Sequence, residues 1–219
     1  MIPRGIGLLG GTFDPVHEGH LAIARAAREA LGLARVDFLP AGRPWQKDLV
    51  SPAEARLAML ELALDKMAGF GVETVELMRL GPTYTIDTIA GLRRRMGPSI
   101  PLVLILGGDQ WRNLHTWRRW RELTDYADLA VCRRAGGPLS ASAEVEAWAA
   151  PHMRAAGALL DSPSGAVAFF DMAPHEASAT EIRRRVRTEP FADAMRALDG
   201  WLPVAVADYI RSRGLYGAH

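Results

Sequence analysis

The segment at residues 10–20, GGTFDPVHEGH, constrains the fold more than any other part of this chain. An apolar run at 6–9 precedes it and predicts a short buried strand, and the alanine-rich run from residue 21 predicts a helix. A glycine turn between a strand and a helix leaves backbone N–H groups unpaired at the positive end of the helix dipole. His17 and His20 stand at this junction, where their imidazoles can donate hydrogen bonds. The segment therefore predicts a binding site for nucleotide phosphates.

Short apolar runs alternate with amphipathic stretches along the chain, which is the pattern of βαβ units around a parallel sheet. We predict strands over 6–10, 35–39, 71–77, 102–107, 127–132 and 166–171. We predict helices over 19–31, 53–68, 85–96, 140–155, 179–187 and 203–212. This order indicates an α/β fold in which a Rossmann-like, doubly wound parallel sheet binds its ligand at the carboxyl ends of the strands. We expect a single domain over 1–219, with a small C-terminal helical annex over about 175–219.

Composition and charge exclude several classes of protein. The formal net charge of +1 gives none of the basic footprint of a general nucleic-acid-binding protein, so we expect no nucleic-acid partner. The strongest apolar run, at 102–106, is far too short to span a membrane, and residues 1–9 are too short for a signal peptide. Cys132 is the only cysteine, which excludes an internal disulfide and predicts a small core residue. We therefore expect a soluble, cytoplasmic protein without a membrane partner.

A second informative segment, SATEIR, lies at residues 178–183. Ser178 with Glu181 three residues later predicts a capping box that starts a helix. Thr180 and Arg183 then fall on the first turn of that helix, where a hydroxyl, free N–H groups and a guanidinium can hold phosphate oxygens. A plain capped surface helix is the alternative.

Both segments resemble the signatures of the HxGH nucleotidyltransferases. Residues 10–20 match every fixed position of the pattern [GS]-x-F-D-P-x-H-x-G-H, which binds the triphosphate of ATP or CTP in that superfamily. Residues 178–183 are similar to its second signature, I-S-S-T-x-[IV]-R, with alanine at 177 and 179 in place of isoleucine and serine. The resemblance implies that His17 and His20 are catalytic. It also implies that these segments supply ATP-binding residues: Gly10, Gly11, Thr12, Phe13, His17, His20, Ser178, Thr180 and Arg183.

The middle of the chain resembles the bacterial nicotinate-nucleotide adenylyltransferases within this superfamily. The matching elements are 56–60, 82–88, 107–110 with Thr116-Trp117, and 206–216, and they run in family order. The resemblance implies that Thr85, Tyr84 and Trp117 bind the nicotinate mononucleotide. An indole can stack on the flat ring, and backbone N–H groups where a helix begins suit its carboxylate. Trp111 and Trp45 are alternative stacking faces, and Tyr84 is alternatively a core residue.

Four further residues are assigned to the ATP site by the same resemblance. Gly107 and Asp109 follow an apolar strand, where Asp109 holds the ribose hydroxyls or orients a hydrated magnesium ion, or else caps the following helix. Lys47 ends a loop that carries P-P-H-K in the family and has Trp45 and Gln46 here, and we expect this lysine at the triphosphate. Arg134 falls in the family's R-P-G element and faces phosphate or solvent.

The resemblance implies a direct in-line attack by the phosphate of nicotinate mononucleotide on the α-phosphorus of ATP. Pyrophosphate leaves, nicotinate adenine dinucleotide forms, and Mg²⁺ is bound through the ATP phosphates rather than by a protein metal site. Alternatives are phosphopantetheine adenylyltransferase, a cytidylyltransferase and a nucleotide-binding sensor. The first two are not expected to share Tyr84-Thr85 and Thr116-Trp117, and the intact histidines disfavour the sensor. A metal site at His17 and His20 would need a third ligand, and none lies nearby in the sequence. Whether the protein is a homo-oligomer stays open.

Overall fold

The computed structural model describes residues 4–42, 51–134 and 139–218 of the chain. Within these residues one sheet of six parallel strands has the order β3-β2-β1-β4-β5-β6, so the predicted doubly wound α/β fold is confirmed. Its strands are β1 (Ile6–Gly11), β2 (Arg35–Pro40), β3 (Phe70–Val72), β4 (Leu102–Leu106), β5 (Asp128–Arg134) and β6 (Val167–Met172). Strands β1 and β4 are neighbours, and the chain winds outward from them in both directions, so the topological switch point lies between their carboxyl ends.

The helices follow the strands in alternation, as the sequence predicts. The longer ones are α1 (Glu18–Leu31), α2 (Ala53–Leu64), α3 (Thr85–Met96), α7 (Ala179–Thr188) and α9 (Val204–Ser212). The shorter ones are α4 (Gly108–Arg112), α5 (Leu123–Tyr126), α6 (Ala143–Ala149) and α8 (Phe191–Ala197). Short 3₁₀ helices lie at Leu114–Thr116, Trp120–Glu122, Ala150–His152, Ala156–Asp161 and Leu215–Gly217. None of the helices in the described ranges is long and apolar enough to cross a membrane.

Two hydrophobic cores cover the two faces of the sheet. Successive residues of a strand point to opposite faces, and accordingly Leu9 packs with α1 and α2 whereas Leu8 packs with α3 and α5. Cys132 is buried in the core on the Leu9 side, which confirms its predicted role as a core residue. Every residue of β4 is buried, as expected for a central strand that is covered on both faces.

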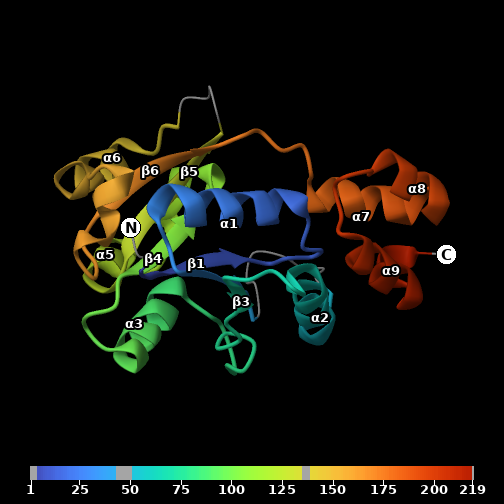
Figure 1. Ribbon diagram of the computed structural model, residues 1–219, viewed down its shortest axis with the longest axis horizontal. Coiled ribbons are helices and arrows are strands. Elements are labelled where there is room, and N and C mark those ends of the chain that lie inside the picture. The colour runs from blue at the N-terminus through green and yellow to red at the C-terminus, as the bar shows by residue number, and fades with distance from the viewer. Residues whose placement is uncertain (1–3, 43–50, 135–138, 219) are drawn as a thin grey trace.

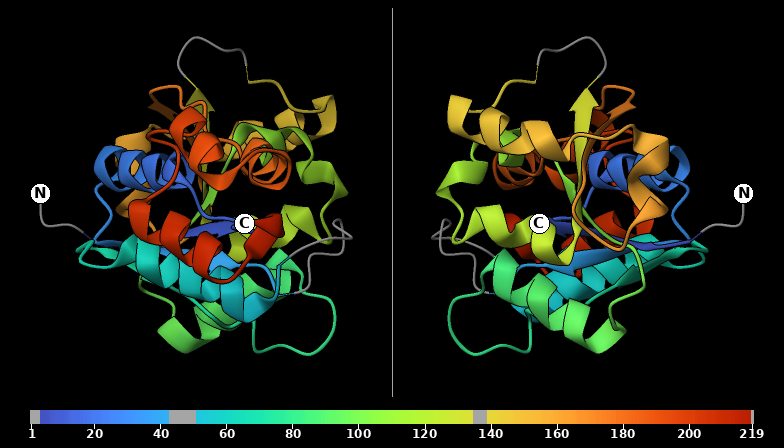
Figure 2. Two further views of the ribbon diagram at one scale, coloured as in Figure 1. Left: turned by 90° about the vertical axis from the view of Figure 1, so that its right-hand side faces the viewer. Right: turned by 90° about the vertical axis from the view of Figure 1, so that its left-hand side faces the viewer.

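The C-terminal helices continue the first core. Figure 1 shows α7, α8 and α9 together at the right-hand end of the molecule, and the left panel of Figure 2 looks onto this end. Ile182, Val206 and Ile210 are fully buried and belong to the core that contains α1. The backbone N–H of Glu18, the first residue of α1, donates to the carbonyl of Trp201 at 2.8 Å. The last part of the chain therefore lies beside the start of α1.

Three predicted elements differ from those observed. The strand predicted over 71–77 ends at Val72, because Glu76 turns inward and its carboxylate accepts the hydroxyl of Thr88 at 2.8 Å. The helix predicted over 140–155 is α6 followed by a 3₁₀ turn, since Pro151 has no N–H with which to continue an α-helix. The helix predicted over 53–68 ends at Leu64, where the backbone leaves the helical region at Asp65.

Candidate active site

The turn between β1 and α1 folds tightly around the ring of Phe13. Phe13 has a φ of +52°, and its ring packs edge-on against His20 with the ring centroids 5.0 Å apart. A Cβ on Gly11 would stand 2.9 Å from the Phe13 ring, so this position requires glycine. A Cβ on Gly10 would meet no other described group within 4 Å, so Gly10 faces open space. The turn thus leaves room for a ligand directly beside the backbone, as a phosphate site requires.

The two histidines stack on each other at the start of α1. Their ring centroids are 3.7 Å apart and their planes are inclined by 27°. His17 is the N-cap residue of α1, and its backbone N–H donates to Nδ1 of His20 at 3.3 Å. A neutral His20 therefore carries its proton on Nε2, where the proton can be donated to a ligand.

His17 is a neutral group in the folded protein. Its side chain is 7% exposed, and Nδ1 is buried without a hydrogen-bond partner in the described part of the chain. Burial, and after it the charge of His175, lowers the pKa of His17 to about 4. His17 therefore acts at neutral pH as a hydrogen-bond donor and not as a cation. His175 was missed by the sequence analysis because it lies 158 residues from His17 and no local pattern links them.

The structure brings the second predicted segment to the first. Nη1 of Arg183, on the first turns of α7, donates to the backbone carbonyl of Asp14 at 2.6 Å. Thr180 lies beside it, with Oγ1 3.5 Å from Nη2 of Arg183. Two stretches that are about 165 residues apart in the sequence therefore meet at the end of β1, where both are expected to contact phosphate.

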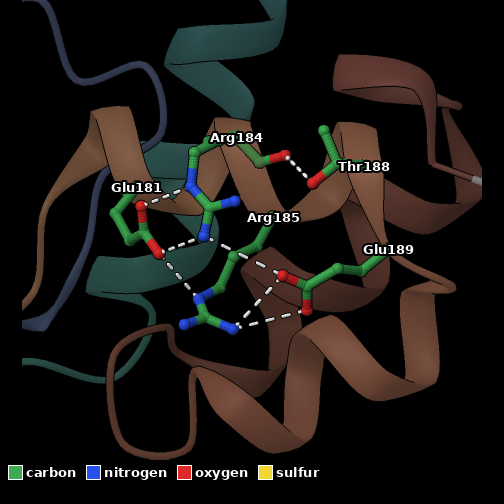
Figure 3. Close-up of polar contacts among 5 residues, drawn as sticks. All are labelled: Glu181, Arg184, Arg185, Thr188 and Glu189. Carbon is green, nitrogen blue, oxygen red and sulfur yellow. Dashed lines mark hydrogen bonds and ion pairs between the residues drawn. The ribbon is translucent and has the colours of Figure 1, made fainter.

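The predicted capping box at Ser178 is wrong. Ser178 is the N-cap residue of α7, but its side chain makes no capping hydrogen bond. The carboxylate of Glu181 accepts instead from Arg184 at 2.6 and 2.7 Å and from Arg185 at 2.8 Å, and both arginines also pair with Glu189 (Figure 3). The guanidinium of Arg184 binds both oxygens of Glu181, so this carboxylate is turned to the arginines and not to the helix cap. The Ser178 side chain takes no part in the cap either.

Gln110 links the carboxyl ends of β1 and β4. Its Oε1 accepts the N–H of Gly107 at 2.8 Å, and its Nε2 lies 3.5 Å from the carbonyl of Gly10. Gly107 is thus the N-cap of α4, so the alternative that Asp109 caps this helix is wrong. The side chain of Asp109 is 83% exposed and forms an ion pair with Arg112. It stands at the switch point, where a ribose or a hydrated ion can reach it.

The predicted mononucleotide residues lie at the start of α3 and after α4. Tyr84 is the N-cap of α3 and Thr85 is its first residue, as predicted. The guanidinium carbon of Arg118 lies 4.7 Å from the centre of the Tyr84 ring. Tyr84 and Trp117 are both half-buried and pack against the same hydrophobic core.

The three neighbouring tryptophans, Trp111, Trp117 and Trp120, differ in how deeply they are buried. Trp111 is 2% exposed and Trp120 is 5% exposed, so both are packing residues. Trp111 meets Phe169 edge-on with the ring centroids 5.6 Å apart, and Trp120 meets Trp148 edge-on at 4.9 Å. The half-buried Trp117 keeps part of its ring surface available to a ligand. The alternative that Trp111 stacks on the substrate is therefore unfavourable.

Of the remaining predicted residues, the structure describes Arg134 but not Lys47 or Trp45. Arg134 is the last residue of β5, at the same edge of the sheet as Gly11. Lys47 and the alternative stacking residue Trp45 lie outside the described residues. Within the described ranges, no group of three or more His, Cys, Asp and Glu side chains is arranged to hold a metal ion.

The low pKa of His17 predicts a pH dependence of stability. The unfolded chain binds a proton at this position near pH 6.5, whereas the folded protein binds it only near pH 4. The contribution of His17 is therefore fully present above pH 6.5, and the free energy of unfolding falls as the pH decreases from 6.5 to 4. Between pH 7 and 4.5, urea unfolding should show wild type losing about 2–3 kcal/mol more than His17→Asn. The exposed His115→Asn variant is the control, and equal losses in wild type and His17→Asn would contradict a neutral His17.

Comparisons with known proteins agree with this site. A family model described as Cytidylyltransferase-like matches residues 8–185. A protein of Neisseria meningitidis named “Probable nicotinate-nucleotide adenylyltransferase” is 40% identical over 215 residues, which are 97% of this chain and 98% of that protein. One of the same name from Bordetella petrii is 43% identical over 214 residues, which are 97% of this chain and 99% of its own.

Solved structures of similar fold include two of nicotinic acid mononucleotide adenylyltransferase from Plasmodium falciparum. The one complexed with NaAD has a TM-score of 0.74 at 14% sequence identity, and the one complexed with APC has a TM-score of 0.72 at 13%. Each covers 99% of this chain and 98% of its own. At this level of identity the structures support the fold alone. The assignment to a family rests on the relatives that are similar in sequence.

Proposed function

Because the chain belongs to the family of nicotinate-nucleotide adenylyltransferases, we propose that it transfers the adenylyl group of ATP to nicotinate mononucleotide. The products are nicotinate adenine dinucleotide and pyrophosphate. The observation that carries the proposal is the stacked pair of His17 and His20 at the end of β1, with Arg183 bonded to the same turn. This arrangement offers hydrogen-bond donors and a positive charge to a triphosphate on two sides.

The reaction needs positioning and charge stabilisation more than covalent chemistry. A phosphate oxygen of the mononucleotide forms a bond to the α-phosphorus of ATP, and the bond from that phosphorus to the bridging oxygen breaks as pyrophosphate leaves. The imidazole N–H groups of His17 and His20 donate to phosphate oxygens that gain charge in the transition state. The guanidinium of Arg183 holds the leaving pyrophosphate. The transferred group passes directly between the substrates, so no protein nucleophile is required.

We propose that a magnesium ion accompanies ATP. Mg²⁺ keeps most of its water and binds through substrate phosphates and one or two carboxylates rather than through a dedicated protein cage. The exposed carboxylate of Asp109, at the switch point, is the group best placed to contact the water around the ion. The ion would neutralise part of the negative charge of the triphosphate.

The choice of acceptor tests the proposal. Purified protein is incubated with ATP, Mg²⁺ and nicotinate mononucleotide, nicotinamide mononucleotide or phosphopantetheine, and pyrophosphate is measured. The deamidated mononucleotide should give the highest kcat/KM, because backbone N–H groups near Thr85 match a carboxylate and oppose the NH₂ of an amide. A mismatched polar contact costs about 1–3 kcal/mol, which predicts about ten- to a hundredfold discrimination between the two mononucleotides. Equal kcat/KM values for the two mononucleotides would contradict the carboxylate pocket. Turnover of phosphopantetheine but of neither mononucleotide would contradict the proposed reaction.

Removal of either imidazole should abolish most turnover. His20→Ala and His17→Ala each delete one donor to the phosphates, and deletions of comparable donors lower kcat by about 100-fold or more. Activity is compared with that of His115→Ala, an exposed histidine in neither phosphate-binding segment, after circular dichroism has shown that each variant is folded. Near-normal kcat in folded His17→Ala and His20→Ala would refute their assignment.

Trp117→Ala should weaken the mononucleotide far more than ATP. Stacking of an aromatic side chain on a base is worth about 1–3 kcal/mol, so the KM for nicotinate mononucleotide should rise by about ten- to a hundredfold. The KM for ATP should change little, because the residues expected to bind its phosphates lie at 10–20 and 178–183 and not beside Trp117. Trp148→Ala, which removes a half-buried indole that packs on Trp120, is the matched control. Unchanged constants in a folded Trp117→Ala protein would make Trp117 a packing residue.

A further inference from the structure

Three distant segments bond to Asp14, whose side chain is 4% exposed. Its Oδ1 accepts the hydroxyl of Tyr216 at 2.6 Å, and its Oδ2 accepts the backbone N–H of Ser51 at 3.1 Å. The backbone carbonyl of Asp14 accepts from Arg183 at 2.6 Å. Both carboxylate oxygens are therefore engaged within the protein, so Asp14 organises the turn before His17 and does not itself face a substrate.

Tyr216 reaches Asp14 from the C-terminal end of the chain through an unusual backbone turn. Its φ is +59°, a region that side chains other than glycine seldom adopt, and Gly214 (φ +59°) and Gly217 (φ +82°) lie on either side of it. Such a conformation persists only where its surroundings hold it, and it occurs preferentially at functional sites. The ring packs against the core that contains α1. Burial, together with the charge of Asp14, raises the pKa of the Tyr216 hydroxyl, so this hydroxyl stays protonated and donates.

A buried arginine also bonds to the same turn. Arg56 is 1% exposed, and its Nη1 donates to the carbonyls of Thr12 at 3.0 Å and Ala41 at 2.8 Å. Its Nε donates to the carbonyl of Ser51 at 3.1 Å, and its charge attracts that of Asp14. Without the hydroxyl of Tyr216, Oδ1 of Asp14 would lose its partner and the carboxylate would be free to turn toward this guanidinium. The expected result is a displaced turn in a protein that is still folded.

We infer that Tyr216 is a positioning residue for adenylyl transfer, which acts through Asp14 to hold the turn that carries His17. A short hydrogen bond to a carboxylate is strong and directional, so it fixes the turn more firmly than packing alone. The inference rests on the proposed function. It adds to that function the hydroxyl of Tyr216, which lies near the C-terminal end of the chain and outside both phosphate-binding segments.

The test compares Tyr216→Phe with Tyr209→Phe. Each variant removes one hydroxyl from the same C-terminal region, and the Tyr209 ring instead lies near the guanidinium of Arg213 at 5.6 Å. Small displacements of catalytic groups cost up to about a hundredfold, so kcat of Tyr216→Phe should fall by about ten- to a hundredfold. The KM for nicotinate mononucleotide should stay within about threefold of wild type, because Tyr84, Thr85 and Trp117 lie outside this turn. Tyr209→Phe should keep the wild-type kcat.

Several outcomes would overturn the inference. These are an unchanged kcat in Tyr216→Phe, an equal loss in Tyr209→Phe, or raised KM values with kcat retained, which would make Tyr216 a binding residue. If Tyr216→Phe regains the wild-type kcat when it is assayed well below its melting temperature, the role of Tyr216 is merely structural. Wild type in the same assay separates the two claims. An inactive wild type contradicts the proposed function and the inference with it, whereas an active wild type with an equally active Tyr216→Phe contradicts the positioning role alone.

A double variant tests the route through Asp14. If Tyr216 acts through this carboxylate, Tyr216→Phe should cost no further kcat once Asp14→Ala has removed the acceptor, because residues in one network are not additive. Independent, multiplicative losses in the Asp14→Ala, Tyr216→Phe double variant would overturn the route. Melting temperatures of all three variants confirm that each is folded at the assay temperature.

Discussion

The buried carboxylate of Asp14 is the constraint on which the site depends. A carboxylate that is removed from water is stable only when hydrogen bonds and charge compensate it. Tyr216 and Ser51 satisfy its two oxygens, and Arg56 supplies a buried positive charge nearby. These partners come from the C-terminal turn and from both sides of the start of α2. The compensation of one charge therefore brings distant parts of the chain to the end of β1.

The same burial determines the electrostatics of the proposed phosphate site. His17 follows Asp14 by three residues and is buried with it, so its imidazole stays neutral at physiological pH. A neutral donor can bind phosphate without first displacing an internal counterion, and its pKa can rise when the triphosphate arrives, since a negative charge favours the protonated form. The exposed Arg184 and the half-buried Arg185 beside it are instead paired with Glu181 and Glu189. Arg183, the residue of this helix that bonds to Asp14, points to the site.

The sequence allowed the fold and the position of the turn after β1 to be predicted, because both depend on local patterns. The apolar runs at 6–9 and 102–106 are buried strands, and the glycines at 10 and 11 end β1, where Gly11 leaves room for the Phe13 ring and Gly10 faces open space. Elements of four to seven residues such as α4, α5 and α8 were not predicted, since they are too short to show a helical period.

What the sequence did not reveal depends on long-range contacts. The strand predicted over 71–77 failed because Glu76 has a buried partner in α3, and the capping box failed because arginines compete for Glu181. The bond from Tyr216 to Asp14 spans 202 residues, so no spacing rule could indicate it. Burial, which only the folded chain determines, distinguishes Trp117 from Trp111.

The most direct test of the central claim is a crystal structure with the non-hydrolysable ATP analogue that carries a methylene group between the α- and β-phosphates. Its phosphates should lie against the turn of residues 10–17, within hydrogen-bond distance of Nε2 of His20 and of the guanidinium of Arg183. The carboxylate of Asp14 should keep its bond to Tyr216 and should not contact the nucleotide. Phosphates bound elsewhere, or coordinated through Asp14 itself, would refute the proposed roles of His20, Arg183 and Asp14.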